Sequence, residues 1–149
     1  MTAHALSLAA GVSNNSVSHF EANCRLPRLS TLECLANALH ISPGWIAFGM
    51  GAVWEPVDGL RCEGLAARLR AVRAAKGLTL RELDRRAEIS TGASRAVEVG
   101  GMPTLDTIEF LARALGVSPA WLAYGEGPME APTRRQRATQ VEQAQTDEQ

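Results

Sequence analysis

The sequence has few aromatic residues, few cysteines and no long apolar run, the features that are typical of membrane proteins and of disulfide-rich secreted proteins. Only 5% of its 149 residues are aromatic, and its three cysteines (Cys24, Cys34 and Cys62) are odd in number and lack metal-site spacing. No apolar run approaches the roughly 20 residues of a membrane span, and no charged leader precedes an apolar block. We therefore expect a cytoplasmic protein with reduced thiols and no membrane partner. The net charge of −1 gives no overall indication of a nucleic-acid partner.

Catalytic and metal-binding patterns are missing as well. The three histidines are scattered, and no glycine-rich phosphate loop follows a strand pattern. Glu82, Asp84 and Glu88 lie on one predicted helix among arginines, which indicates surface ion pairs. We expect no enzyme activity, no metal, no cofactor and no small-molecule ligand.

The clearest pattern covers residues 65–127 and predicts five short helices. Apolar residues recur at helical spacing over residues 65–76, and a glycine follows them. Thr79 and Glu82 have the form of a capping box at the start of a second helix, because the hydroxyl can accept one free backbone N–H while the carboxylate accepts another.

Three further helices follow in the same stretch. Ser90 is predicted to cap a third helix over residues 91–99. The fourth helix carries an apolar face and ends at Gly116. Ser118, followed by proline at the first helical position, begins the fifth.

These elements occur in a familiar order. The segments LTLRELDRRAEIS, LARALGVSP and WLAYGEG, with a loop from Glu98 to Pro103 between the first two, resemble the phage-repressor (Cro-repressor, XRE) class of helix-turn-helix proteins. The resemblance implies an all-α fold made of lambda-repressor-like five-helix domains. It also implies that the second helix of each helix-turn-helix enters the major groove of DNA.

The sequence also repeats itself. Residues 27–51 and 103–127, offset by 76, are identical at 14 of 25 positions, and upstream the offset becomes 77. Periodicity alone would not align Ser-Pro-x-Trp and Gly-x-Gly together, so we predict a tandem duplication. The predicted organisation is a first helix-turn-helix domain at 1–51, a linker at 52–63, a second domain at 64–127 and a disordered polar tail at 128–149.

The two copies are predicted to be unequal. Met1 aligns with Leu78, so the first copy is truncated and has no counterpart of the helix at residues 65–76. We expect apolar surface around Leu6, Leu32 and Leu35 to be uncovered. The alternatives are that the protein starts upstream, or that contacts with the second copy or with another chain replace the helix.

The resemblance places the DNA contacts around the start of each recognition helix. Base-facing side chains are expected in the first copy at Asn14, Asn15, Ser16, Ser18 and His19. In the second copy they are expected at Thr91, Gly92, Ala93 and Arg95. Phosphate contacts are expected from helix starts and neighbouring loops at Thr2, Ser13, Arg25, Arg28, Thr79, Arg81 and Ser90.

Sequence discrimination is predicted to reside mainly in Asn14 and Asn15. An asparagine amide can donate a hydrogen bond to one adenine edge and accept another from it at the same time. At the related positions of the second copy, Thr91 has a single hydroxyl and Gly92 has no side chain to contact a base. The alternative is that both asparagines only satisfy free N–H groups at the helix start.

Positive charge gathers ahead of the second recognition helix. Such a cluster indicates either the solvated face of two amphipathic helices or a phosphate-facing surface. Its eight members are Arg61, Arg68, Arg70, Arg73, Lys76, Arg81, Arg85 and Arg86.

The sequence therefore predicts sequence-specific binding of double-stranded DNA and regulation of transcription, as a repressor, with a homodimer left open. The alternative is a protein–protein interaction module on a repressor-like scaffold, antitoxin-like or regulator-binding, with little direct DNA reading. The lack of base-reading groups at Thr91 and Gly92 in the second copy and the near-neutral charge favour this alternative. The salt dependence of duplex binding separates the two.

Overall fold

The structure is a computed structural model that describes residues 2–13, 16–23, 26–51, 53 and 61–131. Within this part of the chain all regular elements are helices, and two isolated β-bridges join loops, so the predicted all-α class is confirmed. In chain order the helices are α1 (Ala3–Ala9), α2 (Ser16–Asn23), α3 (Leu29–Leu39), α4 (Pro43–Phe48), the 3-10 helix η1 (Arg61–Gly64), α5 (Leu65–Ala75), α6 (Leu80–Arg86), α7 (Ala93–Glu98), α8 (Leu105–Leu115) and α9 (Pro119–Tyr124).

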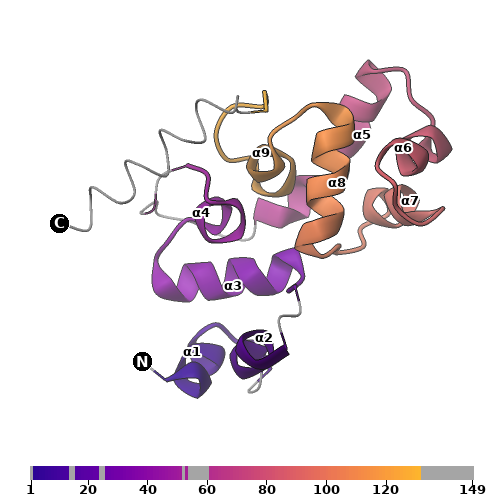
Figure 1. Cartoon of the computed structure of the whole chain (residues 1–149). Helices are drawn as coiled ribbons and strands as arrows, with labels where there is room; N and C mark the ends of the chain where they lie inside the picture. Colours follow the sequence, from indigo (N-terminus) through magenta and orange to yellow (C-terminus); the bar gives the residue numbers. More distant parts are fainter. Residues whose placement is uncertain (1, 14–15, 24–25, 52, 54–60, 132–149) are drawn as a thin grey trace.

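The helices form two groups, called here the first half (residues 2–51) and the second half (residues 61–131). In Figure 1, α1 and α2 lie below α3 at one end of the molecule, and α6 and α7 lie beside α8 at the other. α4 and α9 pack against each other between these ends.

Helix starts follow the local sequence closely. Ser118 accepts a hydrogen bond from the Trp121 N–H (3.4 Å), with Pro119 at the first helical position of α9. The matching sequence in the first half gives the same cap at α4, where Ser42 accepts from the Trp45 N–H at 3.2 Å. The predicted end of the fourth helix at Gly116 and the predicted start of the fifth at Ser118 are confirmed.

One hydrophobic core joins the two halves. Leu29 and Leu32 of α3 are buried in the same cluster as Leu69, Leu111 and the other apolar residues of α5, α8 and α9. Leu32 and Leu35 are only 7% and 5% exposed. The expectation that both are uncovered is wrong, and Leu32 is covered by the core that α3 shares with the second half. Leu6 is half-buried.

Contacts between the halves pair positions that the 76-residue offset relates. Arg28 and Thr104, which the offset relates, form an isolated antiparallel bridge. The rings of Phe48 and Tyr124, another related pair, lie 6.4 Å apart between centroids. The same patch of each half thus meets its counterpart, as in an isologous dimer interface.

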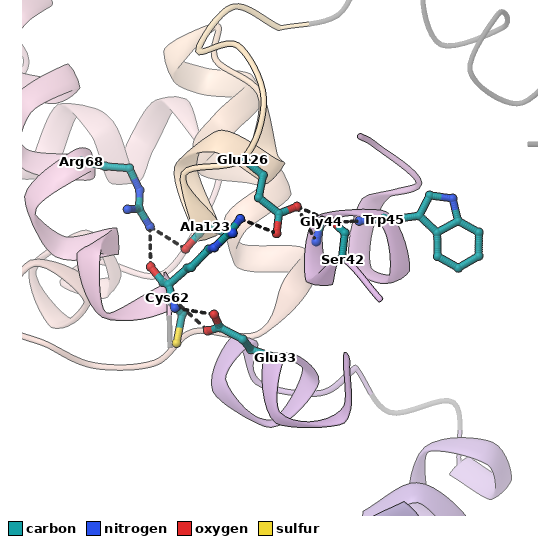
Figure 2. Close-up of polar contacts among 9 residues, drawn as sticks. Glu33, Ser42, Gly44, Trp45, Cys62, Arg68, Ala123 and Glu126 are labelled. Carbon is teal, nitrogen blue, oxygen red and sulfur yellow. Dashed lines mark hydrogen bonds and ion pairs between the residues drawn. The ribbon is translucent and has the colours of Figure 1, made fainter. Parts of the chain in front are cut away.

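Hydrogen bonds across this junction differ between its two sides. On one side the Glu126 carboxylate accepts from the Ser42 hydroxyl (2.6 Å) and from the Gly44 N–H (3.0 Å), which caps α4 (Figure 2). On the other side the Ser118 hydroxyl faces the Met50 sulfur at 3.6 Å. Met50 stands at the position related to Glu126, so the charge-assisted bonds of Glu126 have no charged counterpart at Met50.

A second buried carboxylate joins α3 to η1. Glu33 is fully buried and accepts hydrogen bonds from the N–H groups of Arg61 and Cys62, the latter at 2.9 Å (Figure 2). Burial, together with the hydrogen bond to Glu33, raises the pKa of the Cys62 thiol to about 12. Cys34 and Cys62 are free thiols, as predicted, and Cys24 lies outside the described residues.

Cys62 belongs to the core although it falls within the stretch 52–63 that was predicted to be a linker. Most of that stretch, and residues 132–149 of the predicted tail, lie outside the described residues. No helix in the described ranges is long and apolar enough to cross a membrane.

Candidate nucleic-acid interface

α6 and α7 form a helix-turn-helix in the second half. The predicted capping box is present at α6: the Glu82 N–H donates to the Thr79 hydroxyl at 3.2 Å, and the Thr79 N–H donates to the Glu82 carboxylate at 2.8 Å. These hydrogen bonds lower the pKa of Glu82. The start of α6 is therefore fixed by four residues of local sequence.

The carboxylate of Asp84 orders the start of α7. Asp84 is 4% exposed and accepts from the Gly92 N–H (2.7 Å) and from the Ser94 N–H (2.9 Å). The prediction that Asp84 makes surface ion pairs is wrong, because its side chain turns inward to the free amides of the next helix. The prediction that Ser90 caps a helix at residues 91–99 is also wrong, since α7 begins at Ala93 and no side chain of its own N-cap bonds to it.

The turn between α6 and α7 contains a residue in the left-handed backbone conformation, with positive φ. Glu88 occupies that position with φ of 57°, and Gly11 occupies the related position of the first half with φ of 66°. A side chain at positive φ is strained, whereas glycine adopts this conformation without a clash.

Glu88→Gly is expected to raise the free energy of unfolding by roughly 0.5–1 kcal/mol, because relief of this strain exceeds the extra entropy that glycine has in the unfolded chain. Urea unfolding measures the change. Glu88→Ala is the matched control, since alanine keeps the Cβ atom and is expected to gain nothing. Equal stability of the two variants would contradict the account.

An ion pair fastens the end of α7 to α5. Arg73 donates two hydrogen bonds to the Glu98 carboxylate, from Nε to Oε1 at 2.6 Å and from Nη2 to Oε2 at 3.1 Å. The bonds to Glu98 raise the pKa of Arg73. Arg70 adds a hydrogen bond from its Nη2 to the Glu98 carbonyl oxygen at 3.1 Å. This pair keeps α7 in a fixed orientation on the core.

The residues of the predicted basic cluster therefore fall into two groups, those that bond to other parts of the protein and those that are exposed. Arg68 donates to the carbonyl oxygens of Leu122 (2.9 Å) and Ala123 (2.7 Å) at the end of α9, and Figure 2 shows the bond to Ala123. Burial lowers the pKa of Arg68. Arg61 and Arg73 pair with carboxylates. The members whose side chains remain exposed around α6 are Lys76, Arg81, Arg85 and Arg86.

Most predicted DNA-contacting residues of the second half are exposed. Thr91, Gly92 and Arg95 are exposed at the start of α7, and Ala93 is half-buried. Thr79, Arg81 and Ser90 are exposed on α6 and the turn. Ser94 is fully buried, and its hydroxyl has no hydrogen-bond partner among the described residues.

In the first half, α1 and α2 are the helices related to α6 and α7. Thr2 caps α1 by accepting from the Ala5 N–H at 3.1 Å, and Ser13 accepts from the Ser16 N–H through its carbonyl oxygen at 2.8 Å. Ser18 and His19 are exposed on α2, and Ser16 is half-buried. Arg28 is exposed at the start of α3. Asn14, Asn15 and Arg25 lie outside the described residues.

Sequence reasoning missed Asp84 and Glu33 because both carboxylates bond to residues of other elements. The sequence signal that could have indicated burial of Asp84 is its position directly after Leu83, a buried residue of α6. Within the described ranges, no group of three or more His, Cys, Asp or Glu side chains is placed to hold a metal ion.

Comparison with known proteins agrees with this geometry. No significant match to a solved structure was found. Residues 69–122, which run from α5 into α9 and include the whole of α6, the turn and α7, match the family described as Helix-turn-helix. The match supports a helix-turn-helix of the DNA-binding, transcription-regulating class in this part of the chain.

Proposed function

We propose that the protein is a sequence-specific, double-stranded-DNA-binding repressor of transcription that acts in the cytoplasm and carries two tandem helix-turn-helix units of unequal strength. The single observation that carries the proposal is the exposed start of α7, held by Asp84 and Glu98 and flanked by the exposed cations of α6. A rigid helix start beside positive charge suits insertion into the major groove with phosphate contacts on either side.

In this proposal the second half supplies anchoring more than base reading. Arg81, Arg85 and Arg86 are exposed and are assigned to phosphate contacts, together with the exposed Thr79 and Ser90 hydroxyls. Thr91, Gly92 and Ala93 offer little hydrogen-bonding chemistry to a base edge, and Arg95 is the one long polar side chain in the predicted base-facing set of α7. Contacts of this kind hold a protein on DNA without strong sequence preference.

Base discrimination is assigned mainly to the first half, at Asn14 and Asn15, with support from Ser16, Ser18 and His19. One asparagine in a two-bond contact with adenine is worth about 1–3 kcal/mol of discrimination against the wrong base. We therefore expect a binding site with one strongly specified and one weakly specified half.

Two steps test this assignment. Selection of bound sequences from a random duplex pool first identifies the site. Affinities of Asn14→Ala, Asn15→Ala and Thr91→Ala are then measured for the selected duplex and for a scrambled one. Loss of about tenfold or more on the selected duplex, with scrambled-duplex affinity unchanged, is expected only for the two asparagine variants.

Two outcomes count against the assignment. Equal losses on both duplexes would show that the asparagines act only at the helix start. A larger effect of Thr91→Ala would move base reading to α7.

A second candidate function, a protein-interaction module, is favoured by one observation. Arg68 and Arg73 belong to the basic cluster for which a phosphate-facing surface was one of two interpretations, and they bond to backbone carbonyls and to Glu98. Absence of duplex binding even at low salt would make this candidate the better one.

A further inference from the structure

Helices α1–α4 pack on one another in the same order as α6–α9. α1 packs on α2 and α3, and α3 packs on α4, while α6 packs on α7 and α8, and α8 packs on α9. A backbone contact repeats as well, because the Ser42 N–H donates to the Val53 carbonyl oxygen and the Ser118 N–H to the Met129 carbonyl oxygen, both at 2.9 Å. The relation between the two halves therefore decides how α2 and α7, the predicted recognition helices, are placed.

The contacts between the halves are reciprocal. The Ser42 hydroxyl meets Glu126, and the Ser118 hydroxyl meets Met50. The 76-residue offset turns the first of these contacts into the second, because it relates Ser42 to Ser118 and Met50 to Glu126. Reciprocal contacts are typical of two units related by a two-fold axis, whereas units related by a translation meet through two different surfaces. The two halves are therefore related by an approximate two-fold rotation.

Two further contacts locate the axis of this rotation. A residue that meets its own counterpart lies close to a two-fold axis, which holds for the Arg28–Thr104 bridge and for the rings of Phe48 and Tyr124. Phe48 and Tyr124 end α4 and α9, whereas Arg28 and Thr104 lie directly before α3 and α8, in the segments that connect them to α2 and α7. The axis therefore runs from the α4–α9 contact to a point between these two connecting segments.

Figure 1 agrees with this placement of the two helix pairs. α3 lies between α4 and the pair α1 and α2, and α8 lies between α9 and the pair α6 and α7. The pairs are thus at the outer ends of the two halves, which share one hydrophobic core. Since a two-fold rotation leaves the position along its axis unchanged, α2 and α7 lie at the same level and on the same side of the molecule.

A two-fold axis between two recognition helices matches the symmetry of duplex DNA. When such an axis crosses the duplex at a right angle, it exchanges the two strands, so the two helices meet their half-sites in opposite orientations. Two units related by a translation would instead meet a direct repeat. The contacts between the halves therefore indicate an inverted repeat, although the two units follow each other in one chain.

We propose that one chain of this protein binds one inverted repeat, with its two halves acting as the two subunits of a dimer do and with half-sites about one helical turn apart. The inference rests on the proposed function, which supplies DNA as the ligand, and it adds the arrangement of the site and the number of chains on it. α4 and α9 already pack against each other within the chain, so no second chain is needed to bring two recognition helices to one side.

A variant with two similar recognition helices tests the orientation of the half-sites. Selection from a random duplex pool is expected to return a second copy of the bases assigned to Asn14, inverted relative to the first. Gly92 is kept, because its φ of 93° strains any other residue. The triple variant copies residues from the related positions of the first half, by Thr91→Asn, Ala93→Ser and Arg95→Ser.

The spacing of the selected repeat is tested with the same variant. Insertion of about five base pairs at the centre turns one half-site to the opposite face of the duplex. A loss of about tenfold or more in affinity is expected, because the shared core keeps both helices on one side and one asparagine contact is lost. The unchanged chain is the matched control and is expected to lose less, since its second half contacts phosphates that any sequence supplies.

The number of chains is measured with the unchanged protein. Sedimentation with its selected duplex is expected to show one chain on each duplex. Hydroxyl-radical footprinting of the same complex is expected to show protection at the half-site of the first half and, on one side only, about one helical turn beyond it.

The inference is overturned if the triple variant selects a direct repeat, or if two chains occupy one repeat. A footprint of the unchanged protein that is confined to one half-site per chain also overturns it, even where the triple variant does not fold. Salt-dependent duplex binding would still uphold the proposed function in these cases. Absence of duplex binding at low salt would reject the proposed function and the inference together.

Discussion

Asp84→Ala is expected to lower the free energy of unfolding by about 2–4 kcal/mol. The substitution leaves the Gly92 and Ser94 amides without the acceptor they have now, and a buried unpaired N–H costs about 1–3 kcal/mol. Gly92 has no side chain to replace the cap, so the start of α7 is expected to fray. Urea unfolding measures the loss, and amide exchange at residues 92–96 locates it.

Glu82→Ala is the comparison for Asp84. Glu82 lies on the same helix and also accepts a backbone N–H, but it is exposed, so water can replace the carboxylate. A clearly smaller loss is expected. If the two variants lose equal stability, Asp84 is not the residue that orders the helix-turn-helix.

Glu33→Ala is expected to cost a similar amount, about 2–4 kcal/mol, and to loosen the contact between the halves. The fully buried Glu33 carboxylate is the acceptor for the Arg61 and Cys62 amides, and alanine leaves both unpaired. Loss of Glu33 also opens the environment of Cys62, so this thiol is expected to react with an alkylating agent faster than in the unchanged protein.

The chain contains its own control for this prediction. Glu109 is the residue that the offset relates to Glu33, and it is exposed beside an open hollow. Glu109→Ala is expected to change stability by no more than about 0.5 kcal/mol, as for other surface substitutions. Similar losses for Glu33→Ala and Glu109→Ala would contradict the asymmetry described here.

Local patterns were sufficient to predict the helices of the second half, except for the start of α7 and the 3-10 helix η1. The α8 face, the Ser118 cap and the Thr79–Glu82 capping box depend on residues within a few positions of one another, and all three are present as predicted. The match at residues 69–122 supports the helix-turn-helix class that these patterns indicated.

Roles that depend on distant partners could not be predicted in this way. Asp84 and Glu33 look like surface carboxylates in the sequence, since nothing local shows that Gly92 or Cys62 will lie beside them. Arg68 and Arg73 likewise look like exposed cations until the ends of α9 and α7 are placed. The burial of Leu32 has the same origin, because residues of the other half cover it.

The central claim, that the exposed start of α7 and the cations of α6 serve duplex DNA, is tested most directly by the salt dependence of binding to the selected duplex. A protein that displaces counterions at about six phosphates loses roughly 10³-fold in affinity between 50 and 200 mM salt. We expect a loss of this order, and a shallower slope for the double variant Arg81→Ala, Arg85→Ala. An affinity that does not change with salt, or no duplex binding at the lowest salt, would contradict the account.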